Sequence, residues 1–229
     1  REDVIVHTHA SENAAEVAAV RRALGHDNVD WFHEIGLGSS RLCLAHCVWV
    51  SESEMDRMAA SGTHATHCPG SNLKLASGIA PVVEMRRRGV SVSLGADGAP
   101  CNNRLDLFAE MRLAGLLAKL KHGPAALAAR DVFEMATLGG ARALGLADRL
   151  GTLEPGKLAD LVVLDPATLH VQPFEDPFAA LVYACQPGDV RDVMVNGRWV
   201  VRDRGLLTLE EAAVVAGAHS AWRAVAARL

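Results

Sequence analysis

Histidine and aspartate side chains lie at or just after the ends of short apolar segments in this chain. The first segment leads into His9, the second ends at His46, and the fourth is followed by Asp97. Imidazole nitrogens and carboxylate oxygens suit a borderline divalent metal such as zinc. Where parallel strands are neighbours in a barrel, their carboxyl ends meet at one rim. The residues therefore predict a metal site at such a rim.

Strands that alternate with helices would position these residues. β-Branched and apolar runs predict strands at 4–8, 42–46, 64–68 and 90–94. Helical periodicity predicts helices at 11–24, from 51, at 80–88 and at 105–121. Repeated strand and helix units are typical of a parallel sheet. We expect Ser11 to cap the first helix, Gly25 to end it, a loop at 69–72, and Asn102-Asn103 to cap the helix from 105.

The second part of the chain has a different pattern. One helix is predicted at 129–144, and short strands are predicted within 150–165 and 190–202. Asn196-Gly197 between two of these runs predicts a type I′ hairpin, because both residues tolerate positive φ. An Ala-rich stretch at 208–229 predicts a final helix that begins after Thr208.

Composition limits the possible classes of protein. Half of the 229 residues are hydrophobic, so the chain can bury a core, and the net charge is −4 with Lys and Arg scattered along it. This pattern argues against a nucleic-acid partner. No apolar run is long enough to span a bilayer, and Arg1-Glu2-Asp3 does not resemble a signal peptide. The five cysteines lack zinc-finger spacing, and we expect buried reduced thiols in a cytoplasmic protein.

Five motifs, in this order, make the chain resemble one branch of the amidohydrolase superfamily. The branch includes methylthioadenosine and S-adenosylhomocysteine deaminases, guanine deaminases and triazine hydrolases. The motifs are His9-Ala10-Ser11-Glu12, Leu44-Ala45-His46-Cys47, the stretch from Cys68 to Gly78, Gly95-Ala96-Asp97-Gly98-Ala99, and the stretch from Gly151 to Asp165. The resemblance implies an α/β fold: a (β/α)8 TIM-type barrel with strands five to eight present, part of a small β-sandwich, and a C-terminal helix. The expected units are 1–148, 149–207 and 208–229.

The resemblance also implies a catalytic role for four residues. One divalent metal, with zinc favoured over iron, would be bound by His9 from the fifth strand and Asp97 from the eighth. The metal would lower the pKa of a water, so that a metal-bound hydroxide attacks the substrate. Asp97 would accept the proton of that water, and Glu12 would carry protons to the ring nitrogen and the leaving amine. His46 would orient the hydroxide or the tetrahedral intermediate.

Three further residues are expected to contact the substrate, namely Asn72, Lys74 and Asn102. The implied reaction is hydrolytic removal of an amino group from a nitrogen heterocycle such as a purine, pterin, cytosine-like or triazine ring. The resemblance suggests a homodimer as the oligomeric state.

The chain departs from the family pattern in one respect. The His-X-His pair of the first barrel strand, which supplies two of the usual metal ligands, is absent; His7-Thr8-His9 has that spacing but is followed at once by Ala10-Ser11-Glu12. A complete barrel of this type needs about 250 residues, and only four strand and helix units precede the β-rich region. We therefore expect the N-terminal half of the barrel to be supplied from elsewhere.

Several alternatives remain open at this point. The leaving group could be chloride or an alkylamine, because an activated water can attack any activated ring carbon. The chain could instead be a non-catalytic half-barrel scaffold that needs a partner chain. Locally, Glu12 could serve only as an acidic residue at a helix N-terminus, and His46 could be a hydrogen-bonded core histidine.

Overall fold

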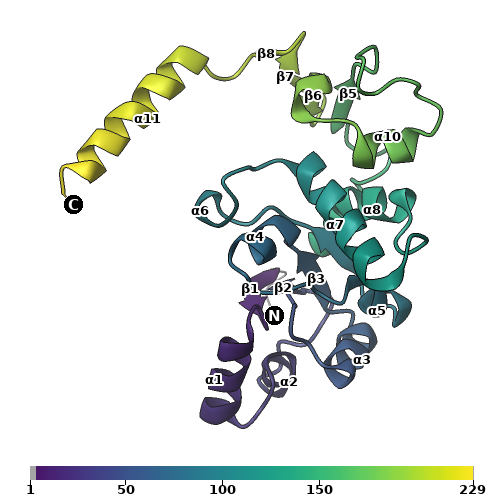
Figure 1. Ribbon diagram of the computed structural model, residues 1–229, viewed down its shortest axis with the longest axis vertical. Helices are drawn as coiled ribbons and strands as arrows, with labels where there is room; N and C mark the ends of the chain where they lie inside the picture. Colours follow the sequence, from purple (N-terminus) through teal and green to yellow (C-terminus); the bar gives the residue numbers. More distant parts are fainter. Residues whose placement is uncertain (1–3, 229) are drawn as a thin grey trace.

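The computed structural model describes residues 4–228 and is built around a parallel sheet (Figure 1). Its strands are β1 (Val6–Ala10), β2 (Leu42–His46), β3 (His64–His67) and β4 (Val92–Leu94), hydrogen-bonded in that order and all parallel. The four predicted strands are thus confirmed, with β2 at the expected bounds. All four carboxyl ends lie on the same side of the sheet, as the metal-site prediction requires.

The main helices follow the strands, and some of them begin after a residue with a capping side chain. They are α1 (Ala14–Leu24), α2 (Asn28–Glu34), α3 (Glu52–Ser61), α5 (Val82–Arg87) and α7 (Leu107–His122). Asn13 caps α1, Ser51 and Glu54 form a capping box on α3, and Asp106 caps α7. The expected caps at Ser11 and at Asn102-Asn103 were wrong. Ser11 has φ 51°, outside the extended backbone that an N-cap needs.

Two short helices follow the third and fourth strands. The segment predicted as a loop at 69–72 belongs to α4 (Pro69–Lys74), and α6 (Ala99–Asn102) follows β4. Pro69 at the first helical position has no N–H to leave unpaired, so a residue typical of turns starts this helix instead.

The single helix predicted at 129–144 is two helices, α8 (Ala129–Ala136) and α9 (Leu138–Ala143). Thr137 interrupts the helix with φ −123° and ψ −88°. The break brings Gly139 of α9 against β4, where an added Cβ would lie 2.7 Å from the carbonyl oxygen of Val92. Only glycine permits this close approach.

The core of the molecule lies around the parallel sheet, with Leu42, Leu44, Met58 and Met85 fully buried. On α7 the buried side is formed by Glu110, Met111 and small residues, whereas Leu116 and Leu120 are exposed. Cys43, Cys47 and Cys68 are buried free thiols, as predicted.

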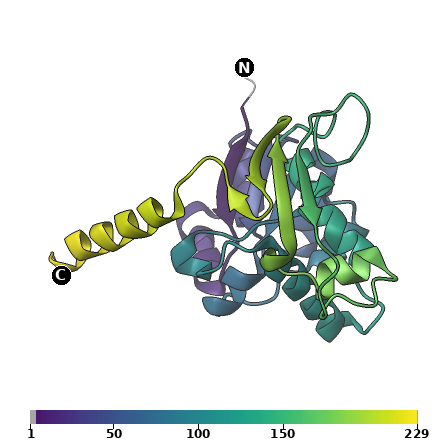
Figure 2. The ribbon, with the colours of Figure 1, turned by 90° about the horizontal axis from the view of Figure 1, so that it is seen from above.

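A second, antiparallel sheet lies beyond α7 and α8 (Figures 1 and 2). It comprises β5 (Leu161–Leu164), β6 (Val190–Val195), β7 (Arg198–Arg202) and β8 (Gly205–Leu206) in sequential order. Asn196 and Gly197 join β6 to β7 with φ 48° and 76°, which confirms the predicted hairpin turn. Helix α10 (Pro177–Tyr183) and the 3-10 turn η1 (Pro187–Asp189) precede β6.

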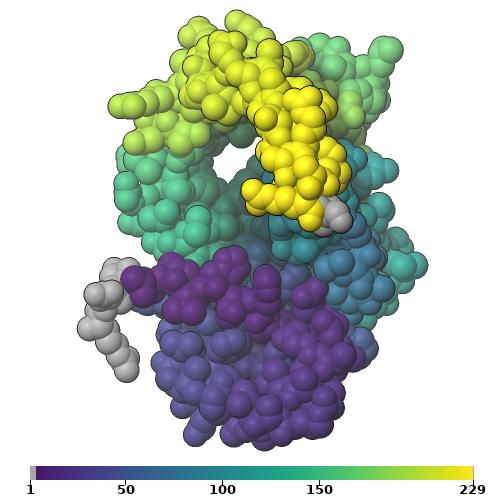
Figure 3. All heavy atoms as spheres, turned by 90° about the vertical axis from the view of Figure 1, so that its left-hand side faces the viewer, coloured from purple at the N-terminus to yellow at the C-terminus, as the bar shows by residue number. Residues whose placement is uncertain are grey.

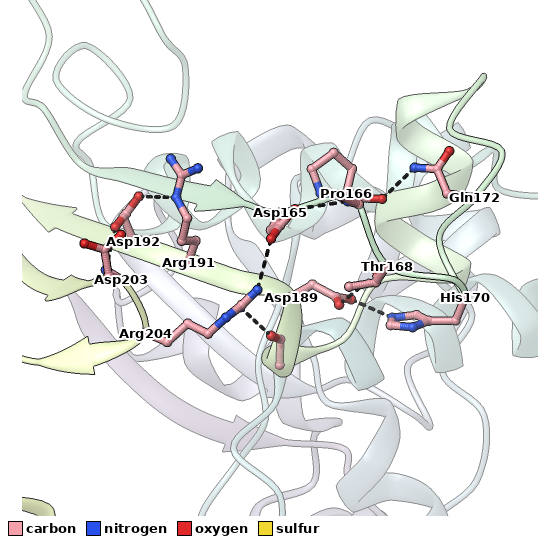
Figure 4. Close-up of polar contacts among 12 residues, drawn as sticks. Asp165, Pro166, Thr168, His170, Gln172, Asp189, Arg191, Asp192, Asp203 and Arg204 are labelled. Atoms are coloured by element: carbon pink, nitrogen blue, oxygen red, sulfur yellow. Dashed lines mark hydrogen bonds and ion pairs between the residues drawn. The ribbon is translucent and has the colours of Figure 1, made fainter.

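Buried and exposed charges hold the loops of the antiparallel sheet together (Figure 4). Asp189, of which only 2% is exposed, accepts hydrogen bonds from the Nε2 of His170 at 2.9 Å and from the backbone N–H of Gln186 at 2.9 Å. Arg204 pairs with Asp165 at 3.2 Å. These contacts lie far along the chain from the residues predicted to do chemistry and serve the fold of the second sheet.

The final helix, α11 (Glu211–Ala226), extends away from both sheets (Figure 2), and its side chains are exposed on the face seen in Figure 3. Its N-cap is Glu210, two residues after the predicted Thr208, and Leu229 lies outside the described residues. Across residues 4–228, no helix has the length and apolar character needed to cross a membrane.

Candidate active site at the carboxyl ends of the parallel strands

His9 and His46 lie side by side at the carboxyl ends of β1 and β2. Their ring centroids are 5.1 Å apart with an interplanar angle of 61°. His9 is exposed on its strand, whereas only 1% of His46 is exposed. His46 is the last residue of β2 and has φ 72°, so the chain turns sharply there. The structure therefore brings together two of the predicted site residues.

The orientation of His46 is set by Asn72 of α4. The Nδ1 of His46 lies 2.8 Å from the Oδ1 of Asn72, and the amide side chain is buried as well. With an amide oxygen as acceptor, Nδ1 carries a proton. The Nε2 of His46 then faces the carboxyl group of Glu12, 3.9 Å from Oε2.

Glu12 lies before helix α1, not within it. The N-cap position belongs to Asn13, and the acidic residue of the first turn is Glu16, which also accepts the N–H of Glu12 at 2.7 Å. The Glu12 carboxyl instead receives a hydrogen bond from the Oγ of Ser77 at 3.1 Å. The alternative that Glu12 serves only as an N-terminal helix acid is not supported by this geometry.

Asp97 follows β4 with a left-handed backbone, φ 62°. Its Oδ2 accepts a hydrogen bond from the Oγ of Ser71 at 2.6 Å, and its Oδ1 accepts one from the N–H of Gly98 at 2.6 Å. Burial by itself raises the pKa of Asp97. The two hydrogen bonds and the nearby rings of His46 and His9 outweigh that effect and lower the pKa below its usual value. Asp97 is thus held as a carboxylate.

Lys74 and Asn102 make contacts within the protein at the same rim. The Nζ of Lys74 donates to the carbonyl oxygen of Pro100 at 2.7 Å and also to the side chain of Asn103. The Nδ2 of Asn102 donates to the carbonyl oxygen of Ala96 at 2.8 Å. Both residues connect the loops around the site, and contact with substrate stays a prediction for them.

The structure also reveals three residues that the sequence argument did not single out. Ser71 and Ser77, which bond Asp97 and Glu12, lie within the quoted stretch from Cys68 to Gly78. Glu110 of α7, of which only 1% is exposed, accepts the backbone N–H of Gly70. A charged residue beside Met111 on the buried side of an apolar helix was the one sign of it in the sequence.

His67, at the end of β3, is unsuited to proton transfer near neutral pH. It is buried, and burial together with the nearby His46 lowers the pKa of His67 to about 3. The ring of His67 is therefore uncharged near neutral pH.

The donor atoms at the rim suit a zinc ion but are few. His9 offers an imidazole nitrogen and Asp97 a carboxylate held ionised by its neighbours. Within residues 4–228, no group of three or more His, Cys, Asp or Glu side chains is placed to hold a metal ion. Catalytic zinc sites have three protein ligands as a rule. The described residues thus fit part of such a site.

The sequence of this chain is similar to those of known proteins. The profile of the Amidohydrolase family matches residues 1–200. A curated relative, 5-methylthioadenosine/S-adenosylhomocysteine deaminase of Syntrophobacter fumaroxidans, is 46% identical over 202 residues, which is 88% of this chain and 46% of the relative.

Two solved structures superpose closely on the chain. The zinc-bound structure of an adenosine deaminase from Xanthomonas campestris is 39% identical with a TM-score of 0.95, over 99% of this chain and 52% of that one. The zinc complex of atrazine chlorohydrolase TrzN from Arthrobacter aurescens TC1 is 28% identical with a TM-score of 0.89, over 95% of this chain and 48% of that one. The chain spans about half the length of the curated relatives it matches.

Proposed function

Because this chain belongs to the amidohydrolase family, we propose that it carries the C-terminal half of the catalytic site of a metal-dependent aminohydrolase. In this proposal β1 to β4 are strands five to eight of a (β/α)8 barrel within residues 1–148. Residues 149–207 form part of a β-sandwich, and the last unit, which begins at residue 208, contains the C-terminal helix α11 (Glu211–Ala226). The close superposition on an adenosine deaminase supports the barrel assignment.

The observation that carries the proposal is the convergence of Glu12, His46 and Asp97 at one rim. The Nε2 of His46 lies 3.9 Å from the Oε2 of Glu12, and Asp97 is close enough to His46 and His9 for their charges to lower its pKa. An acid, an orienting imidazole and a carboxylate base are the groups that hydrolysis of a cyclic amidine requires. The three residues come from the ends of three different strands.

Each of these side chains has a defined task in the proposed reaction. Asp97 accepts the proton of the attacking water as that water adds to the ring carbon. Glu12, held through its Oε1 by Ser77, protonates the adjacent ring nitrogen from Oε2. It then takes up the proton of the hydroxyl group that has added to the ring and transfers it to the amine as ammonia leaves, and the proton held by Asp97 restores Glu12. His46, fixed by Asn72, presents Nε2 to the oxygen that has added to the ring.

A divalent metal, zinc in the first instance, would be held by His9 and Asp97 together with ligands from outside the described residues. When bound, it supplies a positive charge that lowers the pKa of water toward neutrality. Two solved neighbours contain zinc, which supports this choice over iron.

The substrate we propose is a purine ring with an exocyclic amino group, as in the adenosine derivatives named for the relatives. Asn72, Lys74 and Asn102 remain the proposed contacts to it. A second candidate is release of chloride from a triazine, because the chlorohydrolase superposes with a TM-score of 0.89.

We further propose that an N-terminal half-barrel completes the site and that the complete protein is a homodimer. We also propose that it works in the reducing cytoplasm, which suits its five free cysteines.

The test is a substrate panel with the complete purified protein. Adenosine, methylthioadenosine, S-adenosylhomocysteine, guanine and a chlorotriazine are incubated with it, and ammonia and chloride are measured separately. We expect ammonia from the adenosine derivatives, loss of release after chelation, and recovery with zinc. Chloride release alone would favour the second candidate. A stable oligomer without metal or turnover would instead support the non-catalytic scaffold.

A further inference from the structure

Glu110 is a buried carboxylate that lies behind the candidate site on helix α7. Only 1% of the residue is exposed, and each of its oxygens accepts one hydrogen bond. Oε2 accepts the backbone N–H of Gly70 at 2.8 Å, and Oε1 accepts the Nδ2 of Asn102 at 2.8 Å. One side chain thus joins α4, after β3, to α6, after β4.

Both hydrogen bonds lead to Asp97. The Nδ2 of Asn102 also donates to the carbonyl oxygen of Ala96, the residue before Asp97, at 2.8 Å. Gly70 is followed by Ser71, whose hydroxyl donates to the Oδ2 of Asp97 at 2.6 Å. The contacts form a closed circuit that runs from Glu110 through Asn102 to Asp97 and returns through Ser71 and Gly70.

The circuit requires two acceptor oxygens at position 110. The backbone N–H of Gly70 can only donate a hydrogen bond. The orientation of the Asn102 amide is fixed, because its Nδ2 also donates to the carbonyl oxygen of Ala96 and its Oδ1 accepts the N–H of Arg104. A glutamine at 110 would place its own NH₂ against one of these donors. The carboxylate is therefore specific to this arrangement and not interchangeable with an amide of the same size.

The carboxylate of Glu110 lies so close to Gly70 that a side chain at position 70 would collide with it. A Cβ added to Gly70 would lie 2.4 Å from the Oε1 of Glu110 and 2.8 Å from the Nδ2 of Asn102. Burial raises the pKa of Glu110 against the opposing effect of its two hydrogen bonds, so keeping a carboxyl group here is unfavourable by itself. An apolar side chain would pack α7 at lower cost.

We propose that Glu110 is a positioning residue, which acts through Asn102 and Ser71 to fix the carboxylate of Asp97 in the geometry that metal binding and catalysis need. This inference rests on the proposed function of Asp97. Removal of a group that orients a metal ligand through a hydrogen bond lowers metal affinity or activity by about 10- to 100-fold.

The experiment compares Glu110→Gln with Glu54→Gln in the complete protein. Glu54 is a matched control, because only 1% of it is exposed, burial raises its pKa, and it accepts the N–H groups of Val29 at 3.0 Å and Ser51 at 2.8 Å. It connects α2 to α3 and does not contact the site. Zinc affinity is measured by competition with a chelator, alongside kcat, KM and thermal unfolding.

We expect Glu110→Gln to weaken zinc binding and lower kcat by ~10- to 100-fold with little change in KM. Glu54→Gln should reduce thermal stability while leaving zinc affinity and kcat within about twofold of the wild type, since distant sites act independently. Equal zinc affinity in folded Glu110→Gln and wild-type protein would overturn the proposal.

Asn102→Ala and Gly70→Ala break the circuit at two other points, so the test does not depend on the folding of Glu110→Gln. Each should reproduce the loss of zinc affinity, and Glu110→Gln combined with Asn102→Ala should lose less than the product of the two single effects. Fully multiplicative losses would refute a shared circuit. A wild-type protein that binds zinc but releases no ammonia would overturn the proposed function alone, and one that never binds zinc would overturn both.

Discussion

The imidazole of His46 donates its Nδ1 proton to the buried amide oxygen of Asn72 at 2.8 Å, and its Nε2 is thereby turned toward Glu12. The two partners are 26 residues apart and come from β2 and α4. One hydrogen bond between neighbouring strand ends thus selects both the tautomer and the direction of the ring.

Asn72→Ala is expected to release that ring. Without its acceptor the imidazole can rotate and exchange tautomers, so kcat should fall by about 10- to 100-fold while KM changes less. Steady-state kinetics of the complete protein measures both constants. A rise in KM with unchanged kcat would show that Asn72 binds substrate and does not act through His46.

Glu12→Gln is expected to remove turnover without removing the metal. Glutamine keeps the size of the side chain but cannot carry a proton, and loss of a general acid and base costs about 10²- to 10⁴-fold in rate. Elemental analysis should find the same zinc content as in the wild type. Retained ammonia release would rule out Glu12 as the proton carrier.

Gly139→Ala and Gly140→Ala form a matched pair on helix α9. At Gly139 the new methyl group would meet the carbonyl oxygen of Val92 at 2.7 Å, whereas at Gly140 nothing lies within 4 Å. We expect the first to destabilise the fold by about 1–3 kcal/mol. The second should stabilise it by about 0.5–1 kcal/mol, because alanine favours a helix over glycine. Thermal unfolding distinguishes the two.

Asp189→Asn is expected to make stability less dependent on pH. Burial alone raises the pKa of Asp189, but hydrogen bonds from His170 and the Gln186 N–H outweigh it and hold the pKa below the usual 3.8. A carboxyl with a depressed folded-state pKa stabilises the fold above its unfolded-state pKa and loses that effect as the pH falls through the folded-state value. At neutral pH the free energy of unfolding of the wild type should exceed that of the variant by about 1–3 kcal/mol.

Denaturant titrations at a series of pH values check this sign. The difference in free energy of unfolding between wild type and Asp189→Asn should narrow below about pH 4, where the unfolded carboxyl becomes protonated. A difference that stays constant as the pH falls would contradict the assigned direction.

Local patterns predicted the strands and the residues at their ends, because a buried strand such as Leu42–His46 is recorded in consecutive apolar residues. Helix α4 was missed because Pro69-Gly70 is typical of a turn until its place after β3 is known. Glu110 was missed for a different reason. Its partner Gly70 is 40 residues away, so the sequence shows a charged residue on an apolar helix but not the contact that satisfies it when buried.

The circuit through Glu110 and Asp97 has a consequence for how the rim can move. Two successive loops that share one buried anchor cannot open independently, because releasing either leaves a carboxylate oxygen unpaired in the interior. Local unfolding of α4 and α6 should therefore be a single cooperative event.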